Sequence, residues 1–197
     1  VAFDAAGKAC GISAEGPSAR WPLEARLIRW EARAEEMAEL IAQWKRERPA
    51  MLRGVCWYRL PVESDNLNWS WKTLSVVMQG RVPTETLRVV GSISQPTEII
   101  AFNEGEADEP LPRTIAARWS GARLATADAL EGYELKQDQN TVVFERTNAG
   151  ECLRLPPDRQ RKIGWIRCEP PTTIEISFTA GAPHSADRAA EFLRHRN

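Results

Sequence analysis

Hydrophobic and polar residues alternate with two different periodicities along this chain, and the periodicity changes near residue 84. Residues 33–47 place apolar side chains at helical spacing, which predicts an amphipathic helix. Residues 70–79 repeat that spacing behind Ser70, a residue type that commonly caps a helix N-terminus. Between them, residues 52–60 are short and nearly continuously apolar, which predicts a buried parallel strand.

A hairpin is predicted over residues 1–13, because short strand-like runs flank a turn that ends at Gly7. The resulting order of strand, helix, strand and helix is typical of a piece of an α/β layer or barrel. We therefore expect residues 1–83 to be an α/β segment, the C-terminal part of a barrel-like domain.

From Thr84 onward, short alternating runs are separated by turn-rich stretches, a pattern that predicts an all-β, immunoglobulin-like sandwich over residues 84–180. Trp165 and Ile163 stand two positions apart, so we expect both on one strand face. Residues 181–197 form a tail, with a frayed amphipathic helix predicted from 183. The predicted strands are residues 86–94, 97–103, 113–119, 121–126, 140–146, 151–155, 162–168 and 172–179.

Composition and charge narrow the classes of function. The net charge is −1 over 197 residues, so no overall field favours nucleic acid. No apolar run approaches the about 20 residues of a membrane helix, so no membrane insertion is predicted. A strand-like start at Val1 suggests missing upstream sequence, and a signal peptide there would make the protein periplasmic or secreted. The oligomeric state stays open.

Four cysteines occur and none forms a C-x-x-C pair, so we expect no metal site and no cofactor. Cys10 and Cys56 lie in strand-like runs and are interpreted as free buried thiols. Cys152 and Cys168 flank one loop, and the sequence leaves open whether they form a disulfide.

The chain carries eight tryptophans, and the most informative ones follow the predicted parallel strand. Trp57, Arg59, Asp65 and Trp69 stand at its C-terminal end, where α/β proteins build their sites. These four residues are our candidate substrate-binding set, with Trp57 as an apolar floor. The alternative is structural: Arg59 pairs with Asp65 to hold the loop while the indoles fill the strand–helix interface.

No complete catalytic site is visible, and neither G-x-S-x-G nor H-E-x-x-H occurs. Asp4 and Glu15 near strand ends are weak acid–base candidates. Two charged turns have a ligand-binding and a solvated interpretation, and the solvated one is favoured for both. They are the acidic turn of Glu104, Glu106, Asp108 and Glu109, a possible calcium loop, and the basic turn of Arg159, Arg161 and Lys162.

Several short motifs stand out in the first part: Phe3-Asp4-Ala5-Ala6-Gly7, Gly11-Ile12-Ser13-Ala14-Glu15, Trp57-Tyr58-Arg59-Leu60-Pro61, Asp65, Asn68-Trp69 and Thr73-Leu74. In these residues the first part resembles the bacterial domain of unknown function 3142 family. That resemblance implies a chitinase-like (β/α)₈ barrel with a C-terminal β-sandwich, residues 51–60 as the last barrel strand, and Trp57 under the sugar ring. The acidic motif D-x-x-D-x-D-x-E is missing here, so any glycoside hydrolase-like activity would need upstream residues.

These observations lead to one functional hypothesis and two alternatives. The hypothesis is the C-terminal part of a carbohydrate-active protein that binds a glycan or another small molecule at the strand end. The first alternative is a structural or protein-binding β-sandwich module without catalytic activity. The second is a small-molecule enzyme with Asp4, Glu15 or Asp65 as base.

Overall fold

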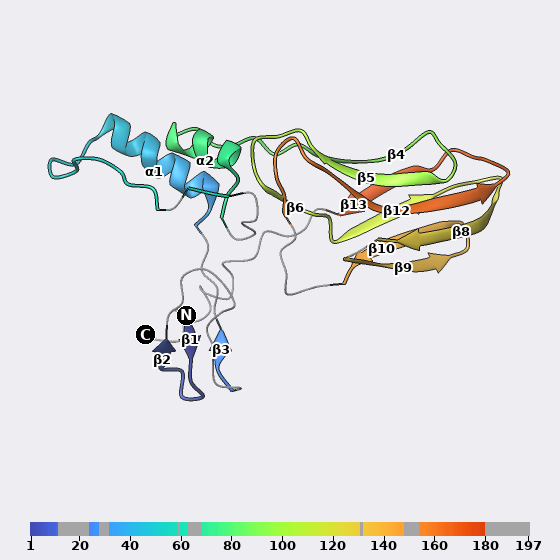
Figure 1. Ribbon diagram of the computed structural model, residues 1–197, viewed down its shortest axis with the longest axis horizontal. Helices are drawn as coiled ribbons and strands as arrows, with labels where there is room; N and C mark the ends of the chain where they lie inside the picture. Colours follow the sequence, from blue (N-terminus) through green and yellow to red (C-terminus); the bar gives the residue numbers. More distant parts are fainter. Residues whose placement is uncertain are drawn as a thin grey trace. The chain divides into compact units, whose positions relative to one another are not determined.

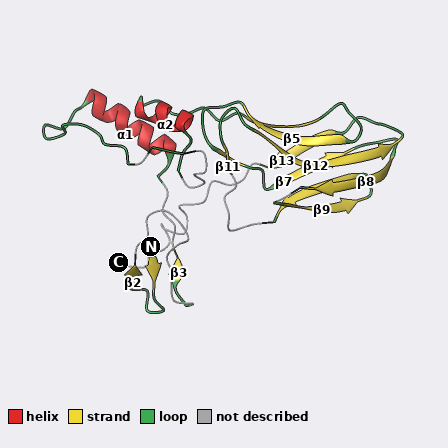
Figure 2. Ribbon diagram, viewed as in Figure 1, coloured by secondary structure: helices red, strands yellow, loops and turns green. Residues whose placement is uncertain are grey.

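The computed structural model describes residues 1–11, 24–27, 32–58, 60–62, 68–130, 132–147 and 154–179. Its contacts divide the chain into two compact units, Val1–Pro83 and Thr84–Asn197. Strands dominate the described residues, with two helices among them, so the fold is rich in β-sheet (Figures 1 and 2). Every strand pair in this part of the chain is antiparallel.

The first unit opens with a small three-stranded sheet in the order β2-β1-β3. Its strands are β1 (Ala2–Phe3), β2 (Ala9–Gly11) and β3 (Arg26–Leu27). The Asp4 carboxylate accepts hydrogen bonds from the amides of Ala6, at 3.0 Å, and Lys8, at 2.9 Å. Gly7 takes a φ of +76°, a conformation that suits glycine. The predicted hairpin is confirmed, and the Asp4 carboxylate stabilises its turn.

Both predicted helices are confirmed, and they pack on each other. They are α1 (Ala34–Arg46) and α2 (Trp71–Met78). The Ser70 hydroxyl caps α2 by accepting from the Thr73 amide at 3.4 Å. Gly80, at φ +70°, lies so close to α1 that a Cβ there would be 3.0 Å from the Ala42 nitrogen. Lys45 of α1 donates to the Gln79 carbonyl oxygen at 2.8 Å and fixes the same contact.

The parallel strand predicted over residues 52–60 is wrong. Its described residues belong to no helix or strand, although their chain is mostly apolar. The Arg48 guanidinium holds the start of the segment by donating to the carbonyl oxygens of Leu52, at 2.8 Å, and Arg53, at 2.6 Å. Apolar sequence alone does not make a strand, because a strand needs a neighbour with free backbone groups. The described residues therefore show no barrel layer.

The second unit consists mainly of two four-stranded antiparallel sheets. The first has the order β4-β5-β12-β8: Leu87–Gly91, Thr97–Asn103, Gln160–Glu169 and Arg123–Ala129. The second has the order β13-β7-β10-β9: Glu175–Thr179, Thr114–Arg118, Thr141–Arg146 and Tyr133–Asp138. A two-residue pair, β6 (Glu109–Pro110) with β11 (Arg154–Leu155), accompanies them.

One hydrophobic core lies between the two sheets, because both contribute side chains to a single buried cluster. Along β5 buried and half-buried residues alternate, as expected for a strand with one face on the core. Phe144 of β10 is fully buried and reaches Gly164 of β12, where a Cβ would lie 2.4 Å from its ring. The sheets thus pack as two layers around Phe144.

The second unit departs from the sequence prediction in its strand order. In an immunoglobulin sandwich the second strand pairs with the fifth, whereas β5 pairs with β12, the seventh of the eight main strands. The predicted immunoglobulin-like strand order is therefore wrong, because the strands are distributed differently between the two sheets. Strand β9 was also missed, because its sequence is mostly polar apart from Tyr133 and Leu135. Burial raises the pKa of Tyr133 to about 12. The predicted tail helix lies outside the described residues.

The cysteines differ from prediction too. Cys10 and Cys56 are exposed, since β2 is a short surface strand and the segment around Cys56 forms no strand. Cys168 is a free thiol in the core of the second unit, and burial raises its pKa. Cys152 lies outside the described residues.

Candidate functional site

The predicted strand-end site is only partly described. Trp57 and Trp69 are both half-buried, while Arg59 and Asp65 lie outside the described residues. The strand expected to carry Trp57 to a cleft is not formed. The structure therefore does not bring this set together in the part of the chain that it describes.

A different tryptophan occupies a more defined position, on the outer face of the β4-β5-β12-β8 sheet. Trp165 of β12 stands directly opposite Glu98 of β5 on one side and Asp128 of β8 on the other. Opposed residues on neighbouring strands project from the same face of a sheet. Trp165 is half-buried and lies outside the core cluster. An indole ring with a carboxylate on each side thus lies on the outer surface of the second unit. We call these three residues, Glu98, Trp165 and Asp128, the Trp165 row.

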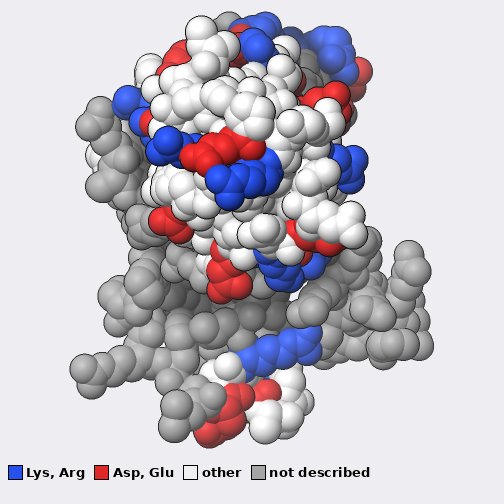
Figure 3. Space-filling view, turned by 90° about the vertical axis from the view of Figure 1, so that its right-hand side faces the viewer, with Lys and Arg blue, Asp and Glu red and all other residues white. Residues whose placement is uncertain are grey.

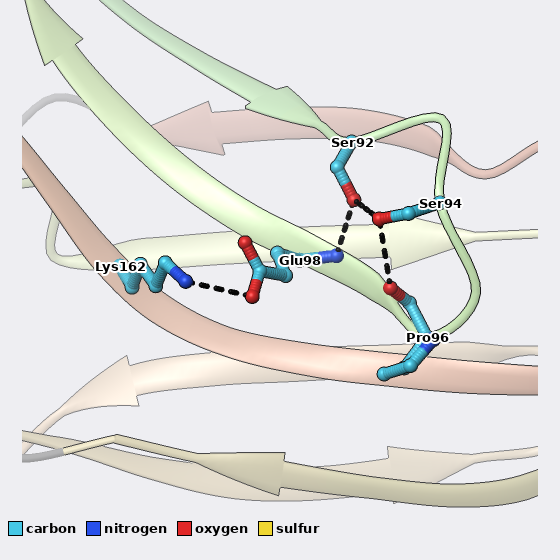
Figure 4. Close-up of polar contacts among 5 residues, drawn as sticks. All are labelled: Ser92, Ser94, Pro96, Glu98 and Lys162. Carbon is cyan, nitrogen blue, oxygen red and sulfur yellow. Dashed lines mark hydrogen bonds and ion pairs between the residues drawn. The ribbon is translucent and has the colours of Figure 1, made fainter.

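Figure 4 shows the polar contacts of Glu98, the residue of β5 opposite Trp165. The Ser92 hydroxyl accepts from the Glu98 amide at 2.9 Å, and it shares a 2.8 Å hydrogen bond with the Ser94 hydroxyl. The Lys162 ammonium group lies 2.7 Å from a Glu98 carboxylate oxygen. The turn before β5 thus fixes the Glu98 backbone, and the ion pair with Lys162 of β12 positions the Glu98 carboxylate.

The same face is apolar beyond Trp165. Val90, Ile100 and Phe102 are half-buried there and lie outside the core cluster. Val90 of β4 opposes Ile100 of β5, so these side chains form a continuous strip. The outer face of the other sheet differs: its central row runs through small or polar side chains with one valine, namely Ser177, Ala116, Val143 and Lys136. Of the two outer sheet faces, the one that carries Trp165 therefore has the larger apolar side chains, although these are half-buried.

A shallow cleft lies at the end of this strip, lined by Phe102, Asn103, Glu104, Asp158, Arg159 and Gln160. Asn103 is buried and fully engaged: its amide nitrogen donates to the carbonyl oxygens of Ala107 and Leu155, each at 2.7 Å. Its amide oxygen accepts from the Gly105 amide at 2.9 Å. Asn103 thus builds the cleft wall, and Phe102 and Gln160 also line the cleft.

The acidic turn binds its own chain. Glu104 pairs with Arg88 at 2.8 Å, and Glu106 accepts from the Thr84 amide at 3.4 Å. Glu109 is buried and accepts from the Thr86 amide at 2.6 Å; burial raises its pKa. Within the described ranges, no three His, Cys, Asp or Glu side chains are placed to hold a metal ion. Calcium binding at this turn therefore gains no support.

Charge does not single out a polyanionic or membrane partner. On the face shown in Figure 3, Lys and Arg side chains lie next to Asp and Glu side chains. From the basic turn, Lys162 is already paired with Glu98. Neither α1 nor α2 has the length and hydrophobicity that a membrane span requires.

Comparison with known families finds one family model that matches the part of the chain carrying this site. Residues 92–169 match the model of a domain of unknown function, DUF8456, which covers less than half of the chain. The resemblance to the domain of unknown function 3142 family is therefore wrong, because the matching family is a different one. No curated protein and no solved structure matches the chain. The match spans Glu98, Asp128 and Trp165.

Sequence reasoning missed the Trp165 row because of a β-bulge. The register of β12 shifts between Lys162 and Gly164, where it pairs with β5. Ile163 consequently enters the core while Trp165 faces outward, against the prediction that the two share a face. The glycine at 164 was the available signal, since an isolated glycine in a strand often marks a bulge.

Proposed function

We propose that this chain is a non-catalytic glycan-binding part of a larger carbohydrate-active, glycoside hydrolase-like protein, and that its binding surface is the Trp165 row. The observation that supports this is the half-buried, outward-facing indole of Trp165 between Glu98 and Asp128. An indole face packs against the C–H groups of a sugar ring, and carboxylates accept hydrogen bonds from sugar hydroxyls. An open sheet face suits binding better than catalysis, which usually requires a site closed to water.

The arrangement of the two sheets is compatible with this proposal. Around both layers the strands follow the order β4, β5, β12, β8, β9, β10, β7 and β13, with the last again close to the first. We propose that this circuit is a jelly-roll sandwich, a fold that includes lectin domains. A fold alone does not define a function, so the argument rests on Trp165. The strand-end set of Trp57, Arg59, Asp65 and Trp69 stays a prediction.

Replacing Trp165 by alanine is expected to weaken glycan binding by about tenfold or more, the effect of about 1.4 kcal/mol of lost stacking. Isothermal titration with neutral cello-, xylo- and chito-oligosaccharides measures the change. Trp71→Ala, at an exposed indole of α2, is the matched control and should bind like the parent protein. Equal affinity of Trp165→Ala and the parent, or no binding by the parent, would contradict the proposal.

One observation favours a protein-binding role, but for the first unit and not for the β-sandwich module considered above. Along residues 51–62, Met51, Tyr58 and Leu60 have exposed fractions of 86%, 88% and 57%. Large apolar side chains this exposed in one segment are typical of a surface that contacts another protein. We propose this segment as the contact surface for that role.

Tyr58→Ser is expected to change the free energy of unfolding by less than about 0.5 kcal/mol, because Tyr58 is exposed in the isolated chain. Leu74→Ser, at a buried position of α2, is the contrasting control and should be strongly destabilising. Denaturant unfolding measures both. If Tyr58→Ser destabilises as much as Leu74→Ser, the segment is buried within the chain and is no contact surface.

A further inference from the structure

We infer that the glycan site is an extended one, running along β5 and β12 from Trp165 to the cleft at Phe102, and that it takes an uncharged linear oligosaccharide. This inference rests on the proposed function, since it describes the ligand of the same sheet face. It adds a second aromatic contact, a direction for the sugar chain and a charge class.

The strand geometry supplies the direction. Glu98, Ile100 and Phe102 alternate with the buried residues of β5, so all three project from the outer face. Phe102 opposes Gln160 of β12, just as Glu98 opposes Trp165. The two rows are four residues apart on β5, which corresponds to about 13 Å along the strand. A chain of about three pyranose rings spans that length.

The middle of the strip fits the inner rings of such a chain. Ile100 lies between the two rows, with Val90 opposite it on β4 and Lys162 opposite it on β12. The aliphatic side chains offer a flat apolar surface to a ring, while Lys162 supplies a hydrogen-bond donor at its border. The two aromatic side chains, Trp165 and Phe102, then contact rings at either end.

The charges along the strip do not favour an anionic chain, because Lys162 and Arg88 are each paired with a carboxylate. Lys162 pairs with Glu98 at 2.7 Å, and Arg88, opposite Phe102, pairs with Glu104 at 2.8 Å. Asp128 adds a carboxylate beside Trp165. A sulfated or carboxylated chain would meet these acidic groups and compete for cations that already have partners. Hydroxyl groups, in contrast, bind paired carboxylates and ammonium groups without breaking the ion pairs.

The test is titration of the intact chain with neutral oligosaccharides from disaccharide to hexasaccharide, with heparin oligosaccharides as the charged comparison. We expect affinity to rise by about tenfold between disaccharide and tetrasaccharide and then to level off. Phe102→Ala should remove this rise while the disaccharide binds as before. Gln160→Ala, at an exposed position, should reduce the rise and provides a second variant that leaves the sheet packing intact.

The outcomes separate this inference from the proposed function. Val143→Ala, on the outer face of the opposite sheet, is the control and should bind like the parent protein. If Trp165→Ala abolishes binding but affinity does not depend on chain length, the extended site is wrong and the proposed function stands. Tighter binding of heparin oligosaccharides than of neutral ones would overturn the charge class. Absence of binding by the parent to every neutral chain would overturn both.

Discussion

Replacing Phe144 by alanine is expected to lower the free energy of unfolding of the second unit by about 4 kcal/mol, the usual effect of removing a buried phenylalanine ring. Phe144 is fully buried in β10, and its ring packs on Gly164 of the opposite sheet. The space opposite a glycine has no side chain that could move in to fill it. The cavity would therefore remain between the layers, and its empty volume adds to the lost transfer free energy.

Chemical denaturation followed by circular dichroism measures this effect. Val143→Ala is the matched control, because Val143 is the preceding residue of the same strand but projects from the outer face. We expect that control to cost about 1 kcal/mol or less. Similar losses for the two variants would mean that the sheets do not pack across Phe144 as described.

Replacing Asn103 by leucine is expected to cost about 3 kcal/mol or more, because the substitution leaves three buried backbone groups without partners. Its side chain binds the carbonyl oxygens of Ala107 and Leu155 and the amide of Gly105, all within 2.9 Å. Leucine has the same number and branching of side-chain heavy atoms, so the loss does not arise from a cavity. The turn after β5 and the strand β11 would lose their common anchor.

Thermal and denaturant unfolding of Asn103→Leu should be compared with Asn140→Leu, which changes an exposed asparagine in a turn. That control should stay within about 0.5 kcal/mol of the parent protein. A second variant, Asn103→Asp, keeps the acceptor for Gly105 but turns a carboxylate oxygen toward the two carbonyl oxygens. It should be destabilised at neutral pH and recover in part in acid, where the protonated group can donate again. A stable, pH-independent Asn103→Asp variant would contradict the assigned amide orientation.

The candidate site was only partly accessible to sequence reasoning. The alternation along residues 97–103 places Glu98, Ile100 and Phe102 on one face of a strand, and that can be read directly from the sequence. Which face of β12 they meet cannot be read in the same way. The bulge beside Gly164 reverses the side on which Trp165 projects, and a register shift of one residue moves every later side chain to the other face.

Local patterns also determined the helices α1 and α2, whose apolar spacing and Ser70 cap are properties of neighbouring residues. The same holds for β5, where buried and half-buried positions alternate over seven residues. Such elements depend on interactions within a few positions of the chain, so their sequence is sufficient to predict them.

Tertiary structure decided the pairing of strands. Residues 52–60 have the composition of a buried strand. Their described part nevertheless pairs with none of the sheets that the structure describes. Polar β9, in contrast, forms a strand because β10 supplies its hydrogen bonds and Tyr133 reaches the core. Strand pairing is a long-range interaction, so its outcome depends on which edges meet in space and not on the composition of one segment.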